Sequence, residues 1–178
     1  MKKIAVITSV LLLAGCSTMQ PPRYAVSVDN IQALKEYETK LHVLGLEQSA
    51  QYDPNCRAMG PIEPADGLAI PDFVSKAFND ELKMAGLHSD AGVTLSGDIS
   101  KIEFSSVSNL TNGYWDIELK LVSSNGKNLT VNSKYKFKSG FDAITACNAT
   151  ADALTPAVQD LIKAVVTHPE FKSLITSS

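Results

Sequence analysis

Alternation of apolar and polar residues dominates the middle of the sequence. It occurs in three runs, over residues 93–104, 114–122 and 128–138, which are separated by stretches rich in Ser, Asn and Gly. A period of two is typical of strands that bury one face. In the first run the apolar positions shift by one after Ile99, which predicts a β-bulge near residues 100–101. Three such strands predict an antiparallel sheet that other elements must cover on one face.

The turn between the second and third runs determines how they pair. A two-residue loop of Asn125 and Gly126 would place core residues opposite polar ones, whereas a three-residue loop over 124–126 keeps the apolar faces together. Because register follows the buried face, we expect the three-residue loop, with Gly126 in the left-handed region. The predicted pairs are Leu121 with Leu129, Leu119 with Val131, Trp115 with Tyr135 and, on the outer face, Asp116 with Lys134.

Two segments with helical spacing flank these strands. The first begins near Pro71, where the missing N–H has no partner to lose, and ends at Gly86, which suits a left-handed cap. The second covers residues 142–165, with apolar residues three or four apart. Since this pattern runs straight through Pro156, we expect one kinked helix. Residues 170–175 predict a last helical turn or two.

The segment before the first helix gives weaker signals. Residues 24–28 and 41–46 predict two strands, residues 31–37 are ambiguous and compatible with a helical turn, and residues 49–69 predict a long loop rich in Pro and Gly. The order β-β-α-β-β-β-α predicts an α+β fold. We expect an antiparallel-rich sheet of about five strands, with two main helices packed on one face. Residues 24–178 should form a single globular domain.

The N-terminus has the layout of a bacterial export signal. Lys2 and Lys3 precede an apolar stretch that is too short to span a membrane and that ends in Leu13-Ala14-Gly15-Cys16. These four residues resemble the lipobox of bacterial lipoproteins, and a secretory signal with a chance cysteine is the alternative. The resemblance implies a signal peptide over residues 1–15, lipidation of Cys16 and a lipidated tether over residues 16–23.

The lipobox resemblance also implies a location. Ser17 follows the cysteine, which by the enterobacterial sorting rule implies the outer membrane, with the domain facing the periplasm. Several acyl chains on one residue anchor a protein stably, so the membrane is an expected partner. The eight residues from Cys16 to Tyr24 reach at most about 28 Å, which keeps the domain close to the membrane.

Cys56 and Cys147 are the two cysteines left after lipidation. Thiols in an oxidising compartment usually pair, so we expect a disulfide that ties the long loop to the last helix. Two buried free thiols are the alternative. No metal site is expected, because two cysteines without neighbouring histidines do not make a ligand set.

The sequence offers little for catalysis. His42, His88 and His168 are far apart, and the Ser124-x-x-Lys127 spacing lies in a hairpin turn instead of on the helix that such a pair requires. There is no Gly-rich phosphate loop, and we expect no cofactor. A net charge of −3 without a basic stripe argues against nucleic acid as a partner. Tyr114 is expected to face outward and is a candidate contact surface.

The lipobox, the helix 73–87, the hairpin 114–138 and the tail Pro169-Glu170-Phe171 together resemble the YajG-like group of uncharacterised envelope lipoproteins. The resemblance is one of pattern and order, so no functional residue follows from it. The leading hypothesis is a non-enzymatic accessory lipoprotein that binds envelope proteins or itself. The alternative is a periplasm-facing module that binds a small ligand or glycan through the loop 49–69, and an enzyme is the third.

Overall fold

The computed structural model describes Met19 and residues 21–176, so the predicted signal peptide and Cys16 lie outside the described residues. No helix among the described residues is both long and apolar enough to cross a lipid bilayer. The elements are α1 (Val28–Leu34), β1 (Leu41–Val43), β2 (Glu47–Gln48), a 3-10 turn (Ala65–Gly67), α2 (Ile70–Ala85), β3 (Val93–Asn109), β4 (Asn112–Ser123), β5 (Asn128–Lys138), α3 (Ala143–Asp152), α4 (Leu154–Val166) and α5 (Phe171–Ile175).

The five strands form one mixed, mostly antiparallel sheet. Its order is β1-β3-β4-β5, and β2 pairs with β3 further along the same edge as β1. The strands β3, β4 and β5 form an antiparallel meander, whereas β1 and β2 run parallel to β3. The α+β class is therefore confirmed, with two short parallel strands that the sequence did not predict as parallel.

The predicted hairpin register is confirmed. Leu119 pairs with Val131 and Asp116 pairs with Lys134, and Gly126 has a φ of +83° in the three-residue turn. The predicted bulge is also present, because the β3–β4 register shifts between Ile99 and Lys101. The hydrophobic pattern was sufficient here because a slip of one residue would turn every core side chain of the strand toward solvent.

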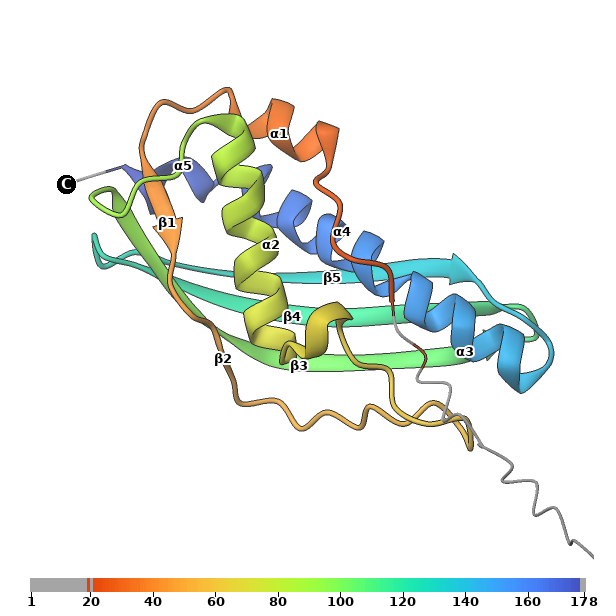
Figure 1. The fold of residues 1–178 in the computed structure, drawn as a ribbon. Helices are drawn as coiled ribbons and strands as arrows, with labels where there is room; N and C mark the ends of the chain where they lie inside the picture. The colour runs from red at the N-terminus through yellow and green to blue at the C-terminus, as the bar shows by residue number, and fades with distance from the viewer. Residues whose placement is uncertain (1–18, 20, 177–178) are drawn as a thin grey trace, which may run out of the picture.

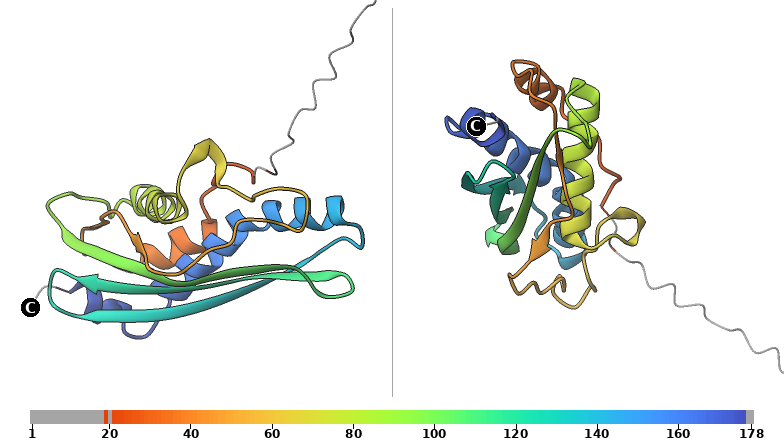
Figure 2. Two further views of the ribbon diagram at one scale, coloured as in Figure 1. Left: turned by 90° about the horizontal axis from the view of Figure 1, so that it is seen from below. Right: turned by 90° about the vertical axis from the view of Figure 1, so that its left-hand side faces the viewer.

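Helices cover one face of this sheet (Figures 1 and 2). As predicted, Gly86 ends α2 with a left-handed φ of +77°, and its N–H donates to the carbonyl of Leu82. The helix α1 contacts α2 and α4, so the cover contains more than the two main helices expected. Trp115 lies fully buried between the sheet and α3, where its indole N–H donates to the carbonyl of Thr150 over 2.9 Å.

The strand predicted over residues 24–28 is wrong. Residues 21–27 have no regular structure, and α1 begins at Val28 after Ser27, whose hydroxyl accepts the backbone N–H of Asn30. A serine that caps a helix removes one of its unpaired N–H groups, which favours the helix over an isolated strand. The strand predicted over residues 41–46 is confirmed only over β1 (Leu41–Val43), because residues 44–46 are not in a strand and β2 begins after them at Glu47.

The prediction of a single kinked helix through Pro156 is also wrong. The structure has two helices, α3 and α4, which meet at Ala153. Proline lacks the N–H that would donate to the carbonyl four residues earlier, and its ring crowds that carbonyl. The apolar spacing continues because both helices pack on the same sheet, so the pattern alone does not reveal the interruption.

The N-terminal segment is fastened to α2 through a buried carboxyl group. Glu81 is 0% exposed, and its Oε1 accepts the hydroxyl of Tyr24 and, over 3.0 Å, the backbone N–H of Ser27. Its Oε2 and the Oδ1 of Asn30 are buried without a hydrogen-bond partner among the described residues. Burial raises the pKa of Glu81 above its ordinary value, and the hydrogen bonds that it accepts offset this rise only in part.

Replacement of Glu81 by glutamine should change how stability depends on pH. The unfolded chain loses this proton near the ordinary pKa of 4.5, whereas the folded chain keeps it to higher pH, so folding of the wild type weakens as pH rises between the two values. The stability of Glu81→Gln relative to the wild type should therefore increase as pH rises above about 4.5, as measured by urea unfolding. Glu38→Gln, at an exposed position, is the control. A difference that does not change with pH contradicts the prediction.

Candidate functional site

Cys56 and Cys147 form the disulfide that the two remaining thiols predicted. Their Cα atoms are 5.8 Å apart, and both residues are buried. The bond joins the long loop before α2 to the middle of α3, 91 residues further along the chain. A disulfide of this kind is typical of proteins outside the cytoplasm.

The other residues noted in the sequence do not come together as one site. Tyr114 lies half-buried on the outer face of β4, with the Nζ of Lys134 3.9 Å from its ring centroid. His42 and His88 are neighbours, with ring centroids 6.4 Å apart, because β1 lies beside the segment that follows α2. His168 lies elsewhere, in the turn before α5, where its Nδ1 accepts the N–H of Glu170.

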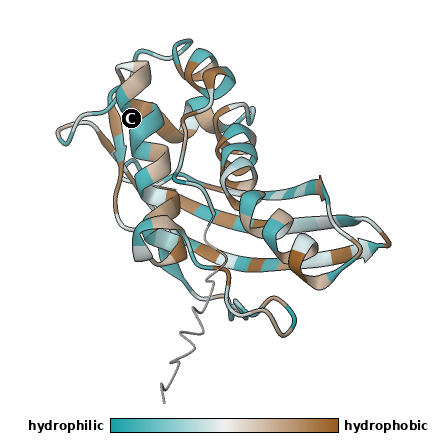
Figure 3. Ribbon diagram, turned by 45° about the vertical axis from the view of Figure 1, so that its right-hand side comes forward, coloured by the Kyte–Doolittle hydropathy of each residue, from teal (hydrophilic) through white to brown (hydrophobic). Residues whose placement is uncertain are grey.

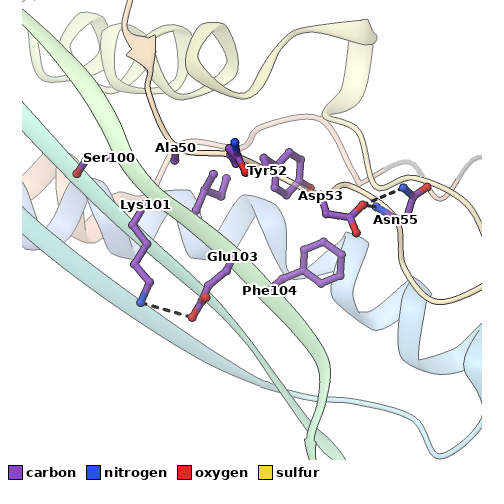
Figure 4. A pocket seen from close by; sticks show the side chains of 10 residues that line it. Ala50, Tyr52, Asp53, Asn55, Ser100, Lys101, Glu103 and Phe104 are labelled. Atoms are coloured by element: carbon purple, nitrogen blue, oxygen red, sulfur yellow. Dashed lines mark hydrogen bonds and ion pairs between the residues drawn. The ribbon is translucent and has the colours of Figure 1, made fainter.

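One hollow of functional interest is a groove along one edge of the sheet, which we name the edge groove (Figure 4). It has a volume of about 460 Å³. One wall is the start of the long loop and the other is β3, and the lining residues are Ala50–Asp53, Asn55 and Ser100–Phe104. Two segments of chain thus form the walls of the groove without pairing there as strands.

The β3 wall of the edge groove has an open backbone edge. On this side β3 pairs with β1 over Val93–Leu95 and with β2 at Asp98 and Ile99, and the N–H of Ala50 donates to the carbonyl of Ile99. Beyond Ile99, no strand in the described part of the chain pairs with this edge. Because alternate residues of a strand direct their backbone groups to the same side, N–H and C=O groups past the bulge face the groove.

The inner end of the edge groove is aromatic. The ring of Tyr52 lies 6.2 Å from the rings of both Phe104 and Trp115, which are themselves 4.9 Å apart. The hydroxyl of Tyr52 donates to the carbonyl of Ile62 over 3.1 Å, and burial raises the pKa of Tyr52 above its ordinary value. This cluster supplies an apolar surface for a bound side chain and fixes the position of the loop.

Charged side chains form the rim of the edge groove. Lys101 lies 3.4 Å from Glu103 and 2.9 Å from Asp116, which is nearly buried and also accepts hydrogen bonds from Asn132 and Lys134. Burial by itself would raise the pKa of Asp116, but the hydrogen bonds from Asn132 and the two lysines outweigh it and lower the pKa. These contacts hold Lys101 in place beside the groove.

Asp53 forms the opposite rim, on the loop wall. Its Oδ1 accepts the backbone N–H of Asn55 over 3.0 Å and the side-chain amide over 2.8 Å. These two hydrogen bonds lower the pKa of Asp53. The rim is thus polar on both sides, and the floor between them is aromatic.

A second hollow, which we name the loop cavity, lies on the other side of Tyr52. Its volume is about 570 Å³, and it lies between the long loop and the start of α2. Its apolar lining includes Tyr52, Pro54, Ile62, Pro64, Leu68 and Pro71. The only charged side chain that lines it within the described chain is Glu63.

Neither hollow has an arrangement that indicates catalysis. The described residues contain no group of three or more His, Cys, Asp or Glu side chains placed to hold a metal ion. None of the three histidines lines the edge groove or the loop cavity. The edge groove offers backbone hydrogen-bonding groups, an aromatic floor and a charged rim.

Sequence reasoning found β3 and the bulge but missed the edge groove and Tyr52. A signal for Tyr52 existed, since it is the one aromatic residue between positions 49 and 69. No signal for the open edge existed, because an unpaired strand edge is defined by the absence of a neighbour in space.

The chain is similar in fold to protein XCC0632 from Xanthomonas campestris, whose crystal structure is described with the family model DUF330. The TM-score is 0.56 and 13% of residues are identical, with 86% of this chain and 97% of that chain covered. At this identity the similarity concerns the fold alone. No protein-family model matches the sequence, and no curated protein matches it. The resemblance to the YajG-like lipoproteins therefore stays a prediction.

Loss of the disulfide should destabilise the domain strongly. The bond closes a loop of about 90 residues, which on the chain-entropy model stabilises the fold by roughly 4–5 kcal/mol. We expect Cys56→Ala/Cys147→Ala to lose stability of this order in urea unfolding, and the wild type to lose as much in the presence of a reductant. Full alkylation of both cysteines in denatured, unreduced protein taken from cells would contradict the disulfide itself.

Proposed function

We propose that this chain is a lipid-anchored protein of the cell envelope that acts by binding another protein chain and not by catalysis. Two features support the location: the lipobox-like residues 13–16 and the disulfide between Cys56 and Cys147. The observation that carries the function is the open edge of β3 in the edge groove.

An extended peptide suits this groove. A strand placed beside β3 would pair with the backbone groups that β2 leaves unpaired after Ile99, as in β-strand addition. One of its side chains would pack on Tyr52 and Phe104, and polar side chains would meet Lys101 and Asp53 at the rim. Backbone pairing supplies affinity with little demand on the sequence of the partner, which suits an accessory protein whose own sequence shows no recognisable catalytic motif.

The anchor would raise the strength of such binding. Met19 is buried and forms a bridge with Ile62, so the chain is held against the domain only three residues after Cys16. This leaves a much shorter free tether than residues 16–23 would give. A domain confined to the membrane surface meets other envelope proteins at high effective concentration, so a modest contact is sufficient. The partner is then an envelope protein or a second copy of this chain.

The loop cavity supports a second candidate function, the binding of a small ligand. Its lining between Pro54 and Pro71 is mostly apolar, and its volume of about 570 Å³ is in the range of small-molecule sites. Filling it with Ala69→Trp should abolish saturable binding of an apolar ligand and leave protein partners unaffected. Tight binding of such a ligand by a strictly monomeric domain would favour this candidate over protein binding.

Lipidation of Cys16 is directly testable. Cys16→Ala should leave an unprocessed precursor, because the thiol that accepts the lipid is missing, and the variant should take up no labelled fatty acid. The measurement is metabolic labelling followed by fractionation of the membranes. Normal processing of the variant at another site, with normal membrane fractionation, would show that residues 1–15 are an ordinary secretory signal.

Crosslinking in intact cells should locate the partner at the edge groove. A photoreactive amino acid at Gln51 or Glu103, on the two walls, should give a discrete crosslinked product, whereas one at Thr130, on β5 away from the groove, should not. Gln51→Trp, which narrows the groove, should reduce the product several-fold while Thr130→Trp leaves it unchanged. Equal products at all three positions would exclude the groove as the binding site.

An enzyme assay provides a separate test of the same proposal. Saturable turnover of a substrate by the purified domain, abolished by one point mutation in a hollow, would favour an enzyme over a binding protein.

A further inference from the structure

Exposed apolar side chains are concentrated at one end of the molecule. Among the described residues, eight large apolar side chains are exposed, and four of them lie in the β3–β4 hairpin, in the β5–α3 connection or at the start of α3. These four, which we name the apolar end, are Val107 (43% exposed), Leu110 (77%), Phe141 (81%) and Ile144 (57%). Figure 3 shows hydrophobic residues at the tip of this hairpin and along α3. An exposed apolar group of this kind usually marks a contact site.

The two segments that carry the apolar end are fastened together. The N–H of Ser139 donates to the carbonyl of Thr111 over 2.8 Å, and its hydroxyl donates to the carbonyl of Ser106. The Nζ of Lys138 donates to Asn112 over 3.1 Å. The hairpin tip and the β5–α3 connection therefore lie side by side at this end of the sheet (Figure 1).

The charge around the apolar end is positive. Residues 104–113 contain no charged side chain, and Lys136 and Lys138 lead up to it along β5, after Lys134, which is paired with Asp116. Residues 134–146 contribute one carboxylate, Asp142, whose oxygen is engaged by the backbone N–H of Thr145 as the cap of α3. Apolar side chains beside lysines suit the surface of a bilayer with acidic lipids. There the apolar side chains would contact the acyl chains, and the lysines would contact the anionic headgroups.

The predicted anchor leaves the domain close to this end. Met19 bridges to Ile62, whose N–H donates to the carbonyl of Pro54, and the same loop is bonded through Cys56 to Cys147 of α3. Ile144 lies one helical turn before Cys147 on that helix. Since Cys16 precedes Met19 by three residues, the attachment point of the predicted lipid lies within about 11 Å of the Cα of Met19. The acyl chains and the apolar end would thus reach the same leaflet.

We propose that the apolar end inserts into the membrane leaflet that holds the anchor, with Leu110 and Phe141 in the acyl region and Lys136 and Lys138 at anionic headgroups. This inference rests on the proposed function for its orientation, and it adds a second membrane contact. Two contacts fix the orientation of the domain, whereas one flexible anchor does not. The edge groove, on the loop side of β3, is then held at a defined height above the membrane.

Vesicle binding by unlipidated protein tests the inference separately from the anchor. The chain from residue 16 onward, with Cys16→Ser and an ordinary secretory signal, should sediment with vesicles of phosphatidylethanolamine and phosphatidylglycerol. Leu110→Ser/Phe141→Ser should weaken this binding by at least about ten-fold, because two exposed apolar side chains are lost. Lys136→Gln/Lys138→Gln should weaken it several-fold on acidic vesicles. Val28→Ser/Met84→Ser removes two exposed apolar side chains elsewhere, 67% and 61% exposed, and should have no effect.

Fluorescence provides a second measurement, which reports the side chains that reach the acyl region in the bound protein. The sequence has one tryptophan, Trp115, which is fully buried. In the same unlipidated background, Phe141→Trp should be quenched by brominated acyl chains, and Met84→Trp should not. Absence of vesicle binding, or equal quenching at both positions, would overturn the inference. So would loss of self-association in Leu110→Ser/Phe141→Ser with vesicle binding unchanged, since that result assigns the apolar end to a second copy of the chain. None of these outcomes bears on lipidation of Cys16.

Discussion

Pairing along β3 is the constraint on which the rest of the structure depends. On one edge this strand pairs with β4 from Leu95 to Ser105, and on the other it holds β1 and β2 over its first half only. The first half of β3, with β1 and β2 beside it, forms the part of the sheet that α2 covers. The second half has no strand of the described chain beside it on this edge and forms the open wall of the groove. The bulge between Ile99 and Lys101 lies at the boundary between these halves, and it coincides with the point where the loop leaves the sheet.

The disulfide joins features that would otherwise be independent. Through Cys56 it holds the loop that forms one wall of the edge groove, and through Cys147 it holds α3, which carries part of the apolar end. The same loop receives Met19, the first described residue after the predicted anchor. Reduction of this bond would therefore loosen the edge groove, the apolar end and the attachment of Met19 together, although these are far apart in the sequence.

Proposals for peptide binding and membrane contact are compatible because they use different surfaces. The edge groove offers an aromatic floor at Tyr52 and Phe104 with a charged rim, whereas the apolar end offers Leu110 and Phe141 beside lysines. A domain whose orientation on the membrane is fixed presents the groove to its neighbours at a constant height. That arrangement favours binding of partners in the same membrane over partners that diffuse freely.

The sequence by itself determined those parts of the fold that depend on local pattern. The meander, the bulge, the register of the 124–126 turn and the end of α2 at Gly86 all follow from periodicity or from backbone conformations that only a few residues adopt. Only the tertiary structure decided the helix at Val28, the division of the last helix at Ala153, the parallel pairing of β1 and β2, and both hollows. These depend on which segments, distant in sequence, supply hydrogen-bond partners or leave them missing, and no local pattern records a neighbour that is absent.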